Sequence, residues 1–347
     1  MTTGTDFEVV AELRERPGPG NIAITPDGRI IISQHQFYKP DFRVVEVLPD
    51  GERRPFPTDR WSRDVGADGI GLGAVLGLRC DPEGVVWMLD NGSAPPKMVA
   101  WDTRADALHR VIYLPAPVTI PGSFHNDLAI DPVHGAIYIA DIAASPEDAA
   151  LVVVDLRTGF ARRLLQEHAS TAAENVSLEV EGRPVRERRG DNEIGEPRVG
   201  INPITIDVDC AWVYYGAMHG TALYRVRTRD LLDDKLSPEE LASRVESFGR
   251  KPPSDGISMD AAGNVYVTDV GASGIGVTAP DGSYRLLFRD AERLCWPDAI
   301  SAGPDGFMYV TVNKLHRTAQ LNAGKDESEP PYYIIRFRPL APAALGR

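Results

Sequence analysis

The chain has 347 residues, of which 37 are Lys or Arg and 50 are Asp or Glu, so its formal net charge is −13. This acidic balance disfavours nucleic acids and anionic membrane surfaces as partners. No apolar run approaches the roughly 18 residues that a membrane span needs, and the first residues lack the basic and apolar segments of a secretory signal, so we expect a cytoplasmic protein.

One hairpin pattern recurs six times along the chain. Each copy runs from an opening residue, usually Asn or Asp, through a short apolar strand and a tight turn to a second strand rich in Val, Ile and Tyr. The copies read PGNIAITPDGRIIIS (from Pro19), VLGLRCDPEGVVWML (from Val75), HNDLAIDPVHGAIYIAD (from His125), INPITIDVDCAWVYYG (from Ile201), SDGISMDAAGNVYVTD (from Ser254) and PDAISAGPDGFMYVTV (from Pro297). The first apolar residues after the openers are 54, 52, 76, 53 and 43 residues apart. A period of roughly 50 residues is typical of a β-propeller.

We therefore predict an all-β fold, a six-bladed β-propeller that uses residues 1–347 as one domain. The alternative, a single β-sandwich, gives no reason for the opening motif to recur six times. The first strand candidate, residues 7–13, and the last, residues 332–337, lie at opposite ends of the chain. We predict that they share one blade, so that no sheet edge is left open.

Two segments interrupt the repeat. The long interval contains a polar, charged insertion at about 163–199, which is either a lid over an axial pocket or a solvated surface loop. The second segment is a short external helix at about 237–248. Ser237 is a suitable N-cap, Pro238 fits the first turn, Glu240 completes a capping box and Gly249 suits the C-terminal end.

The opening residues form the candidate site. Inner strands of a propeller run in the same direction along the axis, so residues in the same phase form a ring at one end of the channel. These residues are Asn21, Leu76 (the apolar exception), Asn126 with Asp127, Asn202, Asp255 and Asp298. Converging amide and carboxylate oxygens suit Ca²⁺ or another divalent metal, since such hard cations take oxygen ligands. Alternatively, Asn and Asp cap the turns by accepting from backbone N–H groups.

Several further residues could move protons or contact a substrate. His125 lies beside the ring, and a neutral imidazole transfers protons in either direction near pH 7. Trp296 stands two residues before the last opener and could form the floor of a pocket. Three more histidines follow the second strands of their blades: His35, His219 and His316. Each of these side chains could equally be structural. The sequence has no nucleophile elbow, zinc-protease motif or phosphate loop, so we expect no nucleotide or organic cofactor.

Longer runs carry a family resemblance. The runs FHNDLAIDP (from Phe124), YYGAMHGTALYR (from Tyr214), PPSDGISMDAAGNVYVTD (from Pro252), CWPDAI (from Cys295) and NKLH (from Asn313) resemble the major royal jelly protein/yellow family, often labelled dopachrome-tautomerase related. The resemblance spans nearly the whole chain. It implies a six-bladed propeller, with either metal-free tautomerase or isomerase chemistry or the capture of a small ligand.

The chain is more distantly similar to the SMP-30/gluconolactonase/luciferin-regenerating family, whose members hold a divalent metal at the top of the same fold. By this resemblance, Asn202 and Asp255 match metal-binding positions and Asn126 matches an asparagine that contacts substrate. Asn21 stands where that family has a glutamate. The exchange removes one negative charge, which implies weaker metal binding or none.

These observations predict a small-molecule enzyme with its active site at the axial mouth. The first expectation is metal-assisted hydrolysis of a lactone-like substrate. Its metal ligands would be Asn21, Asn202 and Asp255, and its proton-transfer groups His125, Asp255 and Asp298. Its substrate-binding residues would be Asn126, Asp127, His35, His219, Trp296 and His316. The alternatives are a metal-free tautomerase or isomerase of a cyclic or aromatic metabolite, in which groups such as His125 and Asp298 move the proton, and a non-catalytic small-ligand binding protein. The oligomeric state is left open.

Overall fold

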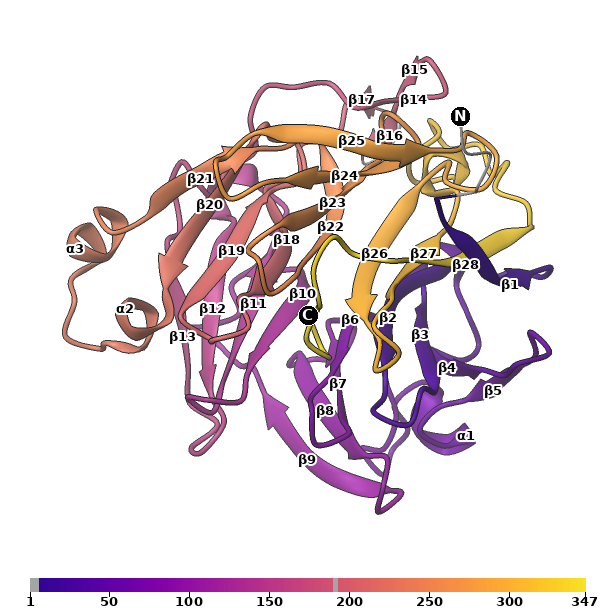
Figure 1. The fold of residues 1–347 in the computed structure, drawn as a ribbon. Helices are drawn as coiled ribbons and strands as arrows, with labels where there is room; N and C mark the ends of the chain where they lie inside the picture. The colour runs from indigo at the N-terminus through magenta and orange to yellow at the C-terminus, as the bar shows by residue number, and fades with distance from the viewer. Residues whose placement is uncertain (1–5, 190–192) are drawn as a thin grey trace.

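The structure, a computed structural model, describes residues 6–189 and 193–347. Six four-stranded antiparallel sheets are arranged around a central axis (Figure 1). The inner strand of each sheet contacts the inner strands of both neighbouring sheets, so the ring is closed. The prediction of an all-β, six-bladed propeller is confirmed.

Three blades come from the first half of the chain, each built from consecutive strands with the inner strand first. The first blade consists of β2 (Pro19–Ile24), β3 (Ile30–Gln34), β4 (Val44–Val47) and β5 (Arg53–Pro55). The second consists of β6 (Val75–Cys80), β7 (Val85–Asp90), β8 (Lys97–Asp102) and β9 (Ala107–Tyr113). The third consists of β10 (His125–Asp131), β11 (Ala136–Asp141), β12 (Ala150–Asp155) and β13 (Ala161–Leu164).

The remaining blades follow the insertion. The fourth consists of β18 (Ile201–Ile206), β19 (Trp212–Ala217), β20 (Ala222–Arg227) and β21 (Glu246–Arg250). The fifth consists of β22 (Ser254–Met259), β23 (Val265–Asp269), β24 (Gly274–Thr278) and β25 (Tyr284–Arg289). The sixth consists of β26 (Pro297–Ala302), β27 (Met308–Val312), β28 (Tyr332–Phe337) and the N-terminal strand β1 (Glu8–Leu13). The predicted sharing of one blade by the two ends of the chain is confirmed, because β1 pairs antiparallel with β28.

Every inner strand is interrupted near its first residue. In all six blades the pairing register between the inner strand and the second strand shifts at this point. The residues within the shifts include the six openers: Asn21, Leu76, Asn126, Asn202, Asp255 and Asp298. Such a bulge leaves a residue unpaired and re-aims its side chain. The recurring hairpin motif therefore marks the bulge in each inner strand at which the opener side chain turns toward the axis.

Neighbouring inner strands approach closely at these bulges. A Cβ at Gly77 would lie 2.4 Å from the carbonyl oxygen of Asn126, and one at Gly256 would lie 2.3 Å from that of Asp298. Both distances are too short for any side chain, so glycine is required after the opener in these two blades.

Hydroxyl groups on the second strands form hydrogen bonds with backbone groups that the bulges leave without a strand partner. Ser33 Oγ accepts from the backbone N–H of Asn21 at 2.8 Å and donates to the carbonyl oxygen of Leu76 at 2.7 Å. Thr268 Oγ1 accepts from the N–H of Asp255 at 3.1 Å. Because buried backbone groups need partners, these hydroxyls fix the bulges and hence the direction of the opener side chains.

The insertion contains two small hairpins at the edge of the molecule (Figure 1). They are formed by β14 (Glu179–Val180) with β15 (Arg183–Pro184), and by β16 (Glu187–Arg189) with β17 (Glu193–Gly195). The helical segments are α1 (Asp59–Ser62), α2 (Thr228–Leu232), α3 (Pro238–Ala242) and the 3₁₀ turns η1 (Gln36–Tyr38), η2 (Pro146–Asp148) and η3 (Leu315–Arg317).

The external helix is shorter than predicted. The capping box between Ser237 and Glu240 is present, but the helix ends at Ala242. Residues 246–250 instead form the outer strand β21, where Gly249 pairs with Leu223. The predicted extent was wrong because pairing with β20 completes the fourth blade, and this outweighs the local helical preference.

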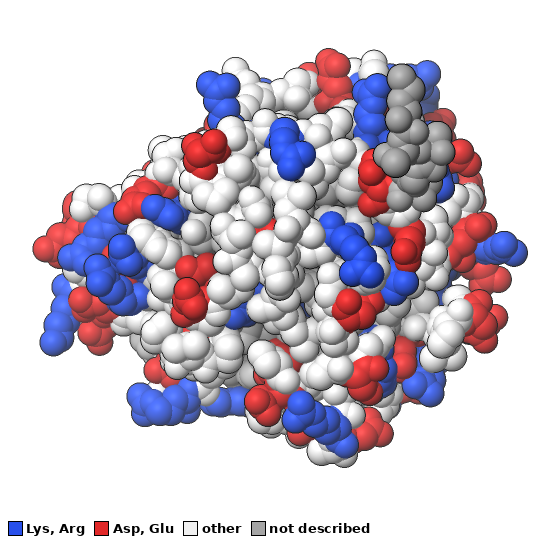
Figure 2. Space-filling model, viewed as in Figure 1, with Lys and Arg blue, Asp and Glu red and all other residues white. Residues whose placement is uncertain are grey.

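Among the described residues, no helix is long and apolar enough to cross a bilayer. Positive and negative side chains are interspersed on the face in Figure 2, so the net charge of −13 is not gathered into one patch there.

Candidate active site at the axial mouth

A cavity of about 770 Å³ lies at the end of the axis where the inner strands begin. All six openers line it, and so does Asp127. Apolar side chains form much of the remaining wall, among them Phe37, Phe124, Met218, Trp296, Leu315 and Leu321. A part-apolar cavity with a few convergent polar groups is typical of small-molecule sites.

The insertion forms part of the cavity wall. Its residues Glu187, Arg189, Pro197, Arg198 and Val199 line the cavity. The Arg198 guanidinium donates to the carbonyl oxygens of Glu174 at 3.0 Å and Val176 at 3.1 Å, which ties two parts of the insertion together. The insertion therefore borders the cavity, and its role as a lid stays a prediction.

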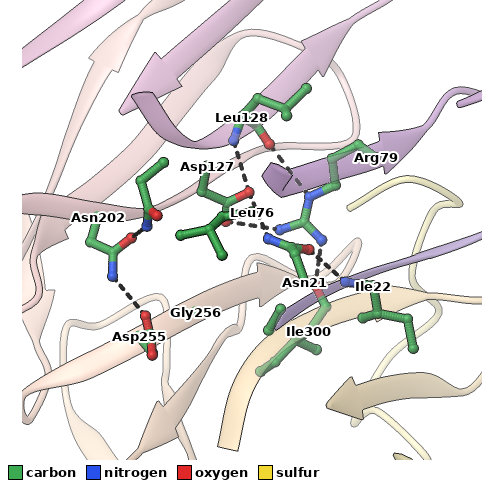
Figure 3. A network of polar contacts seen from close by, with 12 residues as sticks. Asn21, Ile22, Leu76, Arg79, Asp127, Leu128, Asn202, Asp255, Gly256 and Ile300 are labelled. Carbon is green, nitrogen blue, oxygen red and sulfur yellow. Dashed lines mark hydrogen bonds and ion pairs between the residues drawn. The ribbon is translucent and has the colours of Figure 1, made fainter. Parts of the chain in front are cut away.

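A chain of hydrogen bonds crosses the polar side of the cavity from blade to blade (Figure 3). The side-chain amide of Asn126 donates to Asn202 Oδ1. Asn202 Nδ2 donates in turn to Asp255 Oδ1 at 2.7 Å, and Trp296 Nε1 donates to Asp255 Oδ2 at 2.8 Å. Asp255 therefore receives an N–H group on each of its carboxylate oxygens.

Asp298 is held separately, by Asn313. Asn313 Nδ2 donates to Asp298 Oδ2 at 2.6 Å and to the carbonyl oxygen of Pro19 at 2.9 Å. Asn313 is fully buried, so its amide has few alternative orientations. The result is a fixed carboxyl group that lines the cavity beside Asp255.

A buried arginine lies on the other side of Asp127 from Asn202 and Asp255 (Figure 3). Arg79 is 2% exposed, and its guanidinium lies 3.3 Å from Asp127 Oδ2. It also donates to the carbonyl oxygens of Ile300 at 2.7 Å and Leu128 at 3.4 Å. Three blades are thereby joined by one cation at the centre of the ring.

The ionisation of the two cavity carboxyls follows from burial. Burial raises the pKa of Asp255 to about 6, although the N–H groups of Trp296 and Asn202 act in the opposite direction. Burial, with the nearby charge of Asp255, raises the pKa of Asp298 well above its ordinary value. Both carboxyls therefore keep a proton to a higher pH than an exposed aspartic acid does.

The predicted metal ligands do not fit a divalent cation as they are arranged. Asn21 Oδ1 accepts from the backbone N–H of Ile22 at 2.7 Å, so it faces its own backbone. The oxygens of Asn202 and Asp255 accept N–H groups as described, and Arg79 already supplies a positive charge within the ring. In the part of the chain that the structure describes, no group of three or more His, Cys, Asp or Glu side chains is placed to hold a metal ion.

Of the four predicted histidines, His35 alone lines the cavity within the described residues. His125 is fully buried behind the wall, where its Nε2 pairs with Thr119 Oγ1 at 2.9 Å. The structure thus separates it from the cavity, because β10 turns Asn126 inward and its neighbour outward. Burial lowers the pKa of His125.

The other two histidines support the wall from behind. His219 Nδ1 accepts from the backbone N–H of Val199 at 3.1 Å. His316 stacks on Trp296, with ring centroids 5.8 Å apart, and borders a separate, smaller cavity. Burial lowers the pKa of each to about 4, so both are neutral near pH 7. The remaining predicted contact residues, Asn126, Asp127 and Trp296, line the cavity.

Two important residues were missing from the sequence predictions. Arg79 is the one charged residue of VLGLRC, a buried and otherwise apolar strand. A single charge in such a strand was the available signal. Asn313 belongs to the run NKLH, but nothing in the sequence indicated that it would bind Asp298.

Comparison with known proteins agrees with this fold. The family model of the major royal jelly proteins matches residues 74–336. The chain therefore belongs to the major royal jelly protein family. Among curated proteins, none matches it in sequence.

Several solved structures share the fold at low sequence identity. A calcium-binding regucalcin from Agrobacterium tumefaciens is 15% identical, with a TM-score of 0.55 and 99% coverage of both chains. A gluconolactonase from Xanthomonas campestris is 11% identical, with a TM-score of 0.57 and coverage of 96% of this chain and 89% of that one. A virginiamycin B lyase from Staphylococcus aureus is 16% identical, with a TM-score of 0.52 and coverage of 95% and 98%. At such identities the likeness concerns the fold alone.

Proposed function

We propose that the protein is an acid–base enzyme that moves a proton on a small cyclic or aromatic metabolite, as a tautomerase or isomerase does, without a metal. The observation that carries this proposal is the pair of buried carboxyls, Asp255 and Asp298, in a part-apolar cavity. Pairs of titratable groups with separated pKa values are typical of acid–base sites.

The two carboxyls have different roles in this proposal. Asp255, ionised near pH 7, takes a proton from a substrate C–H or O–H group, and the bonding electron pair moves into the conjugated system of the substrate. Asp298 gives its proton to a second substrate atom, so the substrate is isomerised with no net gain or loss. Afterwards Asp255 holds the proton and Asp298 the charge, and a proton returned through solvent restores the starting state.

The surrounding groups support these roles. The N–H groups of Asn202 and Trp296 stabilise the ionised form of Asp255. Burial and the nearby charge of Asp255 favour the protonated form of Asp298, and they act against the single N–H group that Asn313 donates. Aromatic side chains of the wall, such as Phe37 and Phe124, offer flat surfaces to a ring.

Decolourisation of dopachrome methyl ester, a cyclic quinone without a free carboxylate, tests this proposal. We expect the wild type to accelerate it, and Asp255→Asn and Asp298→Asn each to reduce the rate by about 10²-fold or more. The matched control is Asp209→Asn, an exposed turn residue at the opposite end of the fourth blade, which should leave the rate unchanged. A chelator should also have no effect. Equal rates in the wild type and both site variants would refute the proposal, and binding without turnover would support the ligand-capture alternative.

Metal-assisted hydrolysis of a lactone is the second candidate. The observation in its favour is the shared fold with proteins described as a calcium-binding regucalcin and a gluconolactonase. Hydrolysis of D-glucono-δ-lactone that requires added Ca²⁺ and disappears with a chelator would favour it over the first candidate. A cytoplasmic location, a small-molecule substrate and the absence of nucleic-acid and membrane partners stay predictions.

A further inference from the structure

We infer that His35 is a neutral hydrogen-bond donor for a carbonyl oxygen of the substrate, so that the substrate class is cyclic or aromatic carbonyl compounds. This inference rests on the proposed function for the identity of the cavity as an active site. It adds a binding group on the first blade, across a blade boundary from Asp298.

The position of the imidazole is fixed by the chain around it. His35 follows β3 and caps the 3₁₀ turn η1, where its Nδ1 accepts from the backbone N–H of Phe37 at 3.2 Å. Its ring lies edge-on to the ring of Phe37, with centroids 4.5 Å apart. The backbone N–H of His35 donates to the carbonyl oxygen of Gly18 at 3.0 Å. The ring therefore has little freedom to rotate.

The cap also determines which nitrogen carries the proton. A backbone N–H can only donate, so the Nδ1 atom that faces it carries no hydrogen. A neutral imidazole has one N–H and one acceptor nitrogen, which places the proton on Nε2. The residue is 5% exposed, and burial lowers the pKa of His35 to about 3, so the ring stays neutral near pH 7.

The Nε2–H group has no partner among the described residues. No hydrogen bond from it is present, yet it is not one of the fully enclosed polar atoms that lack partners, and His35 lines the main cavity. An unpartnered, uncharged donor that lines the cavity matches an uncharged acceptor. A carbonyl oxygen that gains negative charge when Asp255 removes a neighbouring proton is such an acceptor.

The first measurement is the ¹⁵N–¹H spectrum of histidine-labelled protein at pH 7, with His35 assigned by the spectrum of the His35→Asn variant. We expect the proton on Nε2, and a shift of that resonance when acetophenone is added. A proton on Nδ1, or a charged ring, would overturn the inference.

The second measurement is binding affinity. His35→Asn keeps an oxygen that can cap Phe37 but shortens the side chain, so its amide no longer reaches into the cavity. Acetophenone should bind about fivefold more weakly to this variant than to the wild type, as expected for one net hydrogen bond. Ethylbenzene, which lacks the oxygen, should bind both equally. The control His109→Asn, on the exposed outer strand β9, should resemble the wild type.

Equal binding of acetophenone to the wild type and His35→Asn, or no binding to the wild type, would overturn the inferred substrate class. Because the measurement needs no turnover, its outcome is separate from that of the acid–base proposal. An intact His35 donor together with full activity of Asp298→Asn would refute the acid–base proposal alone.

Discussion

Asp127 and Asp255 line the same cavity, but they have opposite surroundings. Asp127 Oδ2 lies 3.3 Å from the Arg79 guanidinium, and Asp127 Oδ1 accepts from Asn21 Nδ2 at 3.0 Å. The charge of Asp127 is therefore balanced by a cation, and its side chain connects three blades. The oxygens of Asp255 accept only from neutral N–H groups, those of Asn202 and Trp296, among the described residues. Burial raises the pKa of both, yet a cation opposes this effect only at Asp127. The comparison separates a carboxylate that holds the ring together from one that is free to exchange a proton.

The largest expected effect comes from removing the cation. Arg79→Met leaves Asp127 buried without compensation and should lower the free energy of unfolding by about 3–5 kcal/mol. Urea denaturation measures this loss, and Arg14→Met, at an exposed arginine, is the control. The double variant with Asp127→Asn should recover part of the loss. A change below about 1 kcal/mol would mean that Asp127 is already uncharged, and the contrast with Asp255 would fail.

The pH dependence of turnover tests the other half of the comparison. If Asp255 is the base, the rate should rise about tenfold per pH unit below about 6 and then level off, because the pKa of Asp255 is about 6 and only the ionised form accepts a proton. It should fall again at higher pH, where Asp298, whose pKa is raised well above its ordinary value, loses its proton. Decolourisation of dopachrome methyl ester measured from pH 4 to 9 gives this profile. A rate that does not change between pH 4 and 7 would exclude Asp255 as the base.

A smaller shift should follow when Asp255 loses one donor. Trp296→Phe keeps an aromatic wall but removes the N–H group that lies 2.8 Å from Asp255 Oδ2. Since this bond stabilises the charged form, its loss should raise the pKa of Asp255 and move the acid limb of the rate profile upward by about one pH unit. Trp212→Phe, at the first residue of β19 and outside the cavity lining, is the matched control and should leave the limb in place. An unmoved limb in Trp296→Phe would show that the indole does not tune the base.

The repeat made the fold and the ring predictable from the sequence. Five of the six openers are Asn or Asp, and all six sit in a strand bulge near the axis. A pattern that recurs six times reveals such a position even in one sequence. The partners were not predictable in the same way. Asn313 reaches Asp298 within the sixth blade over 15 residues, and Arg79 reaches Asp127 from the neighbouring blade over 48 residues. No local pattern links either pair. His125 was misplaced with respect to the cavity for a related reason, since a one-residue offset at a bulge decides which side chain faces inward.

The smallest expected effect is on the pH dependence of stability. It tests the protonation state of Asp298 without any substrate. A carboxyl whose pKa is raised in the folded state stays protonated there while the unfolded chain ionises, so stability is lost as the pH rises from about 4 toward the raised pKa. Asp298→Asn removes this loss and keeps an oxygen for Asn313. Its melting temperature should therefore equal that of the wild type near pH 4 and exceed it by a few degrees near pH 7. Asp209→Asn should show no such divergence. A variant that is equally stable at both pH values, or less stable at pH 7, would mean that Asp298 is ionised in the folded protein, and Asp298 would then resemble Asp127 rather than act as an acid beside Asp255.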